Sequence, residues 1–148
     1  MKIVSVCLLS LTLVAPGLIA AEKNISSHSS PYPTLGSIER LDPALVDFEL
    51  DVGWASAAGV DCRALLDRLG KRVRLLHLKD IEPRSDAFSM HSADCGTGVV
   101  RWSEIIPAIQ RQKISHLFLE QEPPLARPAL DSARVSYQFL SQALSTSV

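Results

Sequence analysis

Apolar residues follow two patterns that take turns along this chain. Short apolar runs predict strands, and the segments after them, with helical spacing, predict helices. Three short apolar runs predict strands at Val46–Asp51, Val73–Leu78 and His116–Glu120. The second run is almost continuously apolar, as expected for a strand buried on both faces of a parallel sheet. Each run is followed by loop-forming residues and then by helical periodicity. This order favours right-handed βαβ units.

Apolar residues recur at helical spacing in three segments. The first follows Asp61, which is a suitable N-cap, and ends near Gly70, a usual C-terminal cap. The second covers Arg101–Gln112 and contains Pro107, which predicts a kink or a late start. The third runs from 131 to 144, and four of its residues are predicted to face inward: Val135, Phe139, Leu140 and Leu144. The stretch from about 79 to 100 predicts a long loop.

The first 40 residues differ in composition from the rest. Met1-Lys2 gives a positive start, Ile3 to Ala20 is apolar, and small residues precede a polar stretch, which predicts a signal peptide over 1–21 and a secreted or periplasmic protein. The alternative is a membrane anchor, so contact with a membrane is expected only through an uncleaved signal peptide. Residues 22–40 are rich in Ser and Pro and predict a disordered linker. The folded domain is predicted over 41–148.

Composition limits the classes of function. The chain has 148 residues, of which 47% are hydrophobic and 21% charged, so it suits one domain with a packed core. Its formal net charge of -1 argues against nucleic acid as a partner, because phosphate-backbone binding needs clustered Lys and Arg. Cys62 and Cys95 remain after cleavage. Two partly buried free thiols are favoured over a disulfide.

Each predicted strand has a metal-binding residue at or near its end: Asp51, His77 and Glu120. In a parallel α/β barrel these strand ends open onto one face, where catalytic groups gather. Carboxylate oxygens and an imidazole nitrogen suit a hard or borderline divalent cation. Each residue also has a simpler interpretation. His77 is then a hydrogen-bonded core residue, Asp51 caps the following turn, and Glu120 is a solvated residue at a loop entry.

Four motifs resemble one known family in both order and spacing. They are FELDVGWA followed by AGVD, then LLHLKD, then GTGVVRW, then FLEQE, and they cover the chain from about Leu41 to its end. They resemble the xylose isomerase-like family of sugar phosphate isomerases and epimerases.

This resemblance implies a fold, a cofactor and a reaction. The fold is an eight-stranded TIM barrel that holds a divalent cation, such as Mn, Mg, Co or Zn. Asp51, His77 and Glu120 correspond to three of the four usual metal ligands. Glu120 also corresponds to one of two glutamates that move a proton next to the carbonyl of a sugar or sugar phosphate, through an enediolate.

Two further residues are candidates for binding substrate. Lys79 follows the histidine and is placed to hold a substrate oxygen or phosphate, whereas its simpler role is a surface charge. Trp54 stands where many relatives carry a substrate-binding histidine, and its simpler role is packing.

The chain departs from the family in length. A whole barrel needs about 250 residues, whereas the motifs here cover about three C-terminal strand–helix units, which predicts a partial TIM barrel. The glutamate on an earlier strand is missing. Glu39 lies before the first strand, and Glu49 is expected one layer below Asp51, so neither is expected to replace it.

Two hypotheses follow from this departure. In the first, the chain is a metal-dependent isomerase or epimerase. In the second, it is a catalytically inactive barrel fragment, or a half-barrel that needs a partner chain or a second copy, because an open sheet leaves edges and an apolar face. A DNA endonuclease on the same barrel is a weaker third hypothesis, since the charge and the predicted secretion signal oppose it.

Overall fold

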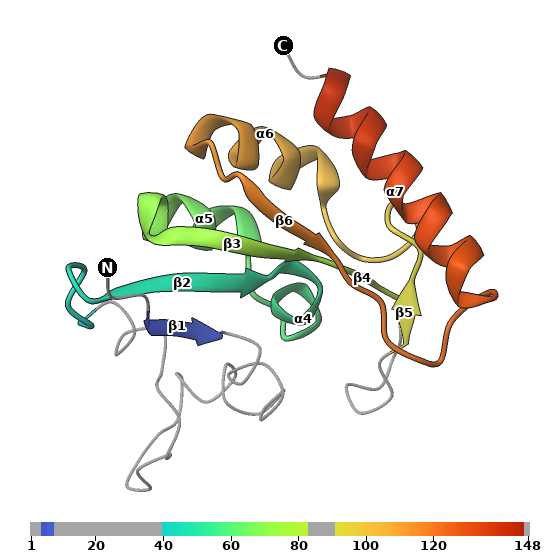
Figure 1. Cartoon of the computed structure of the whole chain (residues 1–148), viewed down its shortest axis with the longest axis horizontal. Helices are drawn as coiled ribbons and strands as arrows, with labels where there is room; N and C mark the ends of the chain where they lie inside the picture. The colour runs from blue at the N-terminus through green and yellow to red at the C-terminus, as the bar shows by residue number, and fades with distance from the viewer. Residues whose placement is uncertain (1–3, 8–39, 83–90, 147–148) are drawn as a thin grey trace, which may run out of the picture.

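Four parallel strands form the main sheet, in the order β1–β2–β3–β6 (Figure 1). The computed structural model describes residues 4–7, 40–82 and 91–146. The strands are β1 at Val4–Cys7, β2 at Val46–Asp51, β3 at Val73–Leu78 and β6 at His116–Leu119. The three predicted strands are therefore confirmed. The only difference is that Glu120 directly follows β6 rather than ending it.

Strand β1 lies in the segment predicted as a signal peptide. It pairs in parallel with β2, with Val4 opposite Val46. The rest of 1–39 lies outside the described residues, so cleavage near residue 21 and the linker over 22–40 stay predictions. Among the described helices, none has both the length and the apolar character needed to cross a bilayer.

The predicted helices are confirmed with small shifts in their ends. Helix α5 covers Cys62–Leu69, and its N-cap Asp61 accepts a hydrogen bond from the Ala64 N–H at 2.9 Å. Helix α6 covers Trp102–Gln112 and continues through Pro107, so the proline causes no late start. A 3₁₀ turn, η2, links α5 to β3 over Gly70–Arg72.

One helix was not expected from the sequence. Helix α4 covers Val52–Ala57, directly after β2, where only a loop was anticipated. Its six residues are too few for helical periodicity to be recognised. Asp51 is its N-cap, which links the start of α4 to the end of β2.

The last helix, α7 at Ala129–Thr146, buries a different set of residues from the predicted one. Leu140 is buried as expected, whereas Val135, Phe139 and Leu144 are only half-buried. Two serines are fully buried instead. Ser136 Oγ accepts a hydrogen bond from the Cys95 N–H at 3.0 Å, and Ser132 Oγ donates one to Asp94. These hydrogen bonds offset the cost of burying the two hydroxyl groups. A hydrophobic pattern does not predict buried serines.

The core lies between one face of the sheet and the helices. Figure 1 shows α5 and α6 along the same side of the sheet. Leu50 of β2 and Leu76 of β3 lie opposite each other in register and are 2% and 0% exposed. They pack in one cluster with Leu66 of α5 and Ile105 of α6. Cys62 and Cys95 are buried free thiols, which confirms the favoured interpretation.

The predicted long loop after β3 contains a short antiparallel pair, β4 at Asp80–Ile81 and β5 at Ser92–Ala93. The buried Asp80 carboxylate holds this region together. It accepts hydrogen bonds from four groups further along the chain at 2.8–3.1 Å, namely the N–H groups of Gly96, Gly98 and Val100 and the Trp102 indole. These bonds fix the segment that leads from β5 to α6.

Gly98 leaves the space that the Asp80 carboxylate occupies. A Cβ at this position would overlap Asp80 Oδ1 and the Ile81 carbonyl oxygen. We expect Gly98→Ala to lower the free energy of unfolding by about 3 kcal/mol, because overpacking and broken hydrogen bonds act together. Urea denaturation measures this change.

Gly59→Ala is the matched control for the Gly98 substitution. Gly59 has a φ of +76° and nothing within 4 Å of an added Cβ, so only backbone strain is introduced. We expect a loss of about 1 kcal/mol. Equal losses in the two variants would show that the Asp80 contact is not the decisive one.

Candidate metal site

Strand register brings the three predicted ligands to one end and one face of the sheet. Asp51 lies opposite His77 in the β2–β3 pair, and His77 lies opposite Phe118 in the β3–β6 pair. Glu120 follows Phe118 by two residues, and its N–H donates to the Leu78 carbonyl at 3.2 Å, so strand-like pairing extends to it. Side chains two residues apart on a strand share a face. The three groups therefore project together.

The ligand atoms of these residues converge. One atom each from Asp51, His77 and Glu120 lies within 4.8 Å of the other two. His77 Nδ1 is 4.0 Å from Asp51 Oδ2 and contacts Glu120 Oε2 directly. The sequence predicted that these three side chains come together, and the structure places them together. Their role as metal ligands stays a prediction.

Asp51 uses its two oxygens differently. Oδ1 accepts a hydrogen bond from the Trp54 N–H at 2.7 Å and thereby caps α4. Oδ2 is buried and has no hydrogen-bond partner among the described residues. Burial raises the pKa of Asp51 to about 6, although the Trp54 N–H and the Lys79 ammonium oppose this rise. The helix-capping role and a ligand role are therefore compatible.

Lys79 is not a surface charge. The residue is 0% exposed, and its Nζ lies 3.1 Å from Glu122, 3.8 Å from Glu120 and 3.9 Å from Asp51. The Trp54 ring centroid lies 5.2 Å from Nζ, so the structure brings Lys79 and Trp54 together, while their binding of substrate stays a prediction. Desolvation of an ammonium is costly, and the surrounding carboxylates offset that cost.

Gly53 of α4 permits this burial of Lys79. A Cβ on Gly53 would come within 2.8 Å of the Lys79 carbonyl oxygen and 2.9 Å of its Cγ. The helix and the segment after β3 can approach closely only because this side chain is absent. The sequence motif did not predict this contact.

Sequence reasoning set aside one acidic residue of the site, Glu49, and missed another, Glu122. Glu49 was expected one layer below Asp51, yet its carboxylate contacts His77 Nε2. Glu122 forms the shortest ion pair of Lys79. Both lie two residues from a predicted ligand, Glu49 before Asp51 and Glu122 after Glu120. This spacing was the available signal, because alternate residues of an extended segment share a face.

The charge balance of the site suits a divalent cation. Four carboxylates, those of Glu49, Asp51, Glu120 and Glu122, surround Lys79 and His77. With a neutral imidazole and ionised carboxylates, these groups carry an excess of negative charge. The unpartnered Oδ2 of Asp51 points into the cluster of ligand atoms. Two oxygens and one nitrogen fit Mn, Mg, Co or Zn in donor type.

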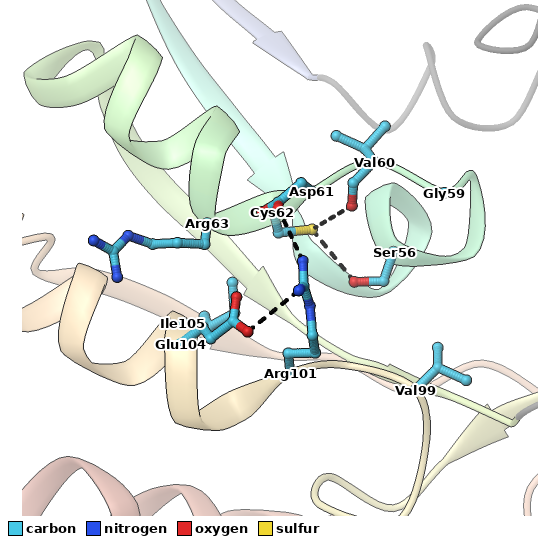
Figure 2. A pocket seen from close by; sticks show the side chains of 10 residues that line it. All are labelled: Ser56, Gly59, Val60, Asp61, Cys62, Arg63, Val99, Arg101, Glu104 and Ile105. Carbon is cyan, nitrogen blue, oxygen red and sulfur yellow. Dashed lines mark hydrogen bonds and ion pairs between the residues drawn. The ribbon is translucent and has the colours of Figure 1, made fainter.

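A separate pocket lies beside the N-terminus of α5 and contains none of the predicted site residues (Figure 2). Burial raises the pKa of the Cys62 thiol in its wall to about 11, so the reactive thiolate is scarce at neutral pH. The Arg101 guanidinium is already paired with Asp61 at 3.0 Å and Glu104 at 3.2 Å. This pocket therefore offers neither an activated thiol nor an unpaired arginine.

Comparisons with known proteins relate this fold to solved structures. No family model and no curated protein matches the sequence. A sugar phosphate isomerase/epimerase from Parabacteroides distasonis has a TM-score of 0.55 and 22% identity, over 72% of this chain and 34% of that one. A second such protein from the same organism has a TM-score of 0.56 and 25% identity, over 79% and 40%. A xylose isomerase domain protein from Alicyclobacillus acidocaldarius has a TM-score of 0.60 and 18% identity, over 76% and 43%.

These similarities confirm the resemblance that the motifs predicted. The chain has an α/β fold with a parallel sheet that matches part of a xylose isomerase-like TIM barrel. It spans less than half the length of each of these three proteins.

The raised pKa of Asp51 has a consequence for stability. The folded metal-free protein holds the Asp51 proton more tightly than the unfolded chain does, with a pKa of about 6 against 3.8. The stabilising contribution of this proton is complete below pH 3.8 and is lost as the pH rises through about 6. We expect Asp51→Asn, which keeps an N-cap, to gain up to about 3 kcal/mol relative to wild type between pH 4 and pH 7. Urea denaturation of metal-free protein measures this difference.

Asp61→Asn is the control with the opposite sign. The Ala64 N–H and then Arg101 lower the pKa of Asp61, so its contribution to stability is present above the unfolded-state pKa and lost as the pH falls. This variant is expected to lose stability near neutral pH rather than gain it. Parallel pH profiles for the two variants would contradict the burial of charge at Asp51.

Proposed function

We propose that this chain is a metal-dependent isomerase or epimerase of a sugar or sugar phosphate. The observation that supports it most strongly is the convergence of Asp51, His77 and Glu120 at the end of the sheet, with a buried Asp51 oxygen that has no hydrogen-bond partner among the described residues. The similar solved structures are described as sugar phosphate isomerase/epimerases and a xylose isomerase domain protein. The fold similarity and the donor set therefore support the same class of reaction.

The residues of the site take distinct roles in this proposal. Asp51, His77 and Glu120 would hold a divalent cation, which would supply Lewis-acid polarisation of the substrate carbonyl and so make the neighbouring C–H more acidic. Glu120 is the residue that removes this proton, and its protonated form then returns it to the neighbouring carbon of the enediolate, which completes an isomerisation. It is the most exposed of the three, with 28% of its side chain accessible against 20% for His77 and 1% for Asp51. Access to substrate thus favours Glu120 as the base.

Lys79 and Trp54 form one wall of the proposed substrate site. The Lys79 ammonium lies 5.2 Å from the Trp54 ring centroid and 3.1 Å from Glu122, and it is buried without a hydrogen-bond partner among the described residues. Because Nζ is buried, it can donate to a sugar oxygen or a phosphate only where the Glu122 carboxylate beside it gives way. The ammonium is already held in place, so little side-chain entropy is lost in that contact. The indole adds an apolar surface for the sugar ring.

A second candidate function is that of a half-barrel that completes its site with another chain. Phe118 of β6 is 49% exposed on the face that carries His77, and β6 has one partner strand among the described residues. The chain also covers only 34–43% of the similar proteins. An exposed edge and an exposed aromatic side chain favour association with a second copy or a complementing barrel half.

Cation binding by the purified full chain tests the ligand set. We expect isothermal titration with Mn²⁺ to give one site, and both His77→Gln and Glu120→Gln to weaken binding by more than about 100-fold, beyond the effect of a group that only supports a ligand. Glu122→Gln is the matched control, because it removes an acidic group that lies beside Lys79 instead of in the ligand cluster.

A ketose panel followed by NMR in D₂O measures exchange of the proton next to the carbonyl, which Glu120→Gln is expected to abolish.

Each outcome of this experiment discriminates between the proposals. Binding and exchange by wild type, both lost in Glu120→Gln, support the enzyme. Binding without exchange, together with self-association in light scattering, favours the half-barrel. Absence of binding by wild type would falsify the metal site.

Substitution of Lys79 separates substrate binding from metal binding. Lys79→Met keeps much of the side-chain volume and removes one positive charge near the ligands. We expect cation binding to stay as tight or become tighter, because a like charge has been removed. The KM for a phosphorylated sugar should rise at least about tenfold, the loss of roughly one charged hydrogen bond.

Lys71→Met serves as the control for this substitution, since Lys71 is an exposed lysine of η2. A similar change in KM in both variants would assign the effect to overall charge. An unchanged KM in Lys79→Met would remove Lys79 from the substrate site.

A further inference from the structure

We propose that Glu49 is a positioning residue that fixes the tautomer and orientation of His77, so that Nδ1 is the metal-binding nitrogen. This inference rests on the proposed metal site, and it assigns a role to a residue outside the ligand group. It also identifies which atom of the imidazole the site uses.

The contacts of the His77 ring support different roles for its two nitrogens. Nε2 contacts Glu49 Oε1 on one side of the ring. Nδ1 faces the other side, where it contacts Glu120 Oε2 and lies 4.0 Å from Asp51 Oδ2. The two nitrogens of a neutral imidazole differ, because one is a donor and the other an acceptor. A carboxylate can only accept, and two of them, Glu120 and Asp51, lie on the Nδ1 side. With a cation between these carboxylates and the Nδ1 lone pair, the single ring proton stays on Nε2 and is donated to Glu49.

Glu49 does not take the place of a fourth ligand in this arrangement. The two ring nitrogens direct their bonds away from each other in the ring plane. A cation held at Nδ1 would therefore be on the other side of the imidazole from the Glu49 carboxylate. The converging ligand atoms accordingly belong to Asp51, His77 and Glu120, and Glu49 is not among them.

Strand geometry explains why Glu49 reaches the ring. Glu49 and Asp51 are two residues apart on β2 and share a face, and β3 pairs them with Leu75 and His77 respectively. The ring of His77 thus lies beside both carboxylates of its neighbouring strand. The side chains of Glu49 and His77 are only 16% and 20% exposed, so their contact is shielded from much of the competing water. A carboxylate that orients a metal-binding histidine in this way increases its basicity.

Metal affinity and histidine NMR of the full chain test this role. Histidine is labelled with ¹⁵N, Zn²⁺ is the diamagnetic probe, and His77→Gln assigns the resonances among the four histidines. We expect zinc-loaded wild type to show a protonated Nε2 and a metal-bound Nδ1. Glu49→Ala should weaken Zn²⁺ binding about 10–100-fold. Glu49→Gln should weaken it less, because an amide oxygen still accepts the bond, and it keeps the measurement available if the alanine variant fails to fold.

Asp47→Asn is the matched control for Glu49→Gln. Asp47 lies on the same strand two residues earlier and pairs with exposed Arg74 at 3.9 Å. Both substitutions remove one negative charge, but only Glu49 contacts His77. We expect the zinc affinity of Asp47→Asn to stay within about twofold of wild type, since a distant exposed charge is screened.

Three results would overturn the role of Glu49. One is metal bound at Nε2, and another is an equal loss of affinity in Asp47→Asn and Glu49→Gln. The third concerns metal-free protein, where the Nε2 proton should exchange slowly in wild type and fast in Glu49→Gln; equal exchange rates refute the contact. Failure of the proposed function is distinct from these, because wild type would then bind no zinc while the metal-free exchange rates still decide whether Glu49 holds the ring.

Discussion

The parallel register of β2, β3 and β6 is the constraint on which the candidate site depends. It places Asp51, His77 and Phe118 in one row, and it brings Glu120 to the same face. Hydrogen bonds between neighbouring strands fix this row, and a slip of one residue would turn each side chain to the opposite face. Leu50, Leu76 and Leu78, which alternate with these residues on β2 and β3, are buried in the core, and the leucines of β6 pack against it partly buried. Packing of the core therefore maintains the geometry of the polar groups.

Burial of charge gives the site its chemical character. Asp51 and Lys79 are almost inaccessible to water, although each carries or can carry a charge. Their mutual distance of 3.9 Å is not a close ion pair, and neither group is fully satisfied within the described structure. Buried polar groups in native proteins usually have partners. Buried polar groups that lack partners are found mainly in binding sites. The lack of partners at both residues is consistent with a cation at Asp51 and a substrate oxygen at Lys79.

The buried polar groups in and around the site are of two kinds. Some have hydrogen-bond or ion-pair partners, and others lack them. Asp80 is buried next to Lys79, yet its carboxylate accepts hydrogen bonds from several N–H groups and stabilises the segment before α6. Asp94 is similarly paired, with Arg127 at 2.7 Å and with Ser132. These two residues are structural. They hold rigid the elements that flank the unsatisfied groups, and such rigidity keeps a binding site preorganised.

The sequence by itself determined the strands at 46–51 and 73–78, the cap of α5 at Asp61, the family resemblance and the three converging residues. These features are local, because apolar periodicity, capping residues and the alternation of strand and helix are expressed within a few positions. Only the tertiary structure decided that Lys79 is buried, that α4 follows Asp51 and that Glu49 contacts His77. These features depend on which side chains from separate segments approach one another, and that depends on register, on the space left by Gly53 and Gly98, and on desolvation, none of which is expressed in the order of neighbouring residues.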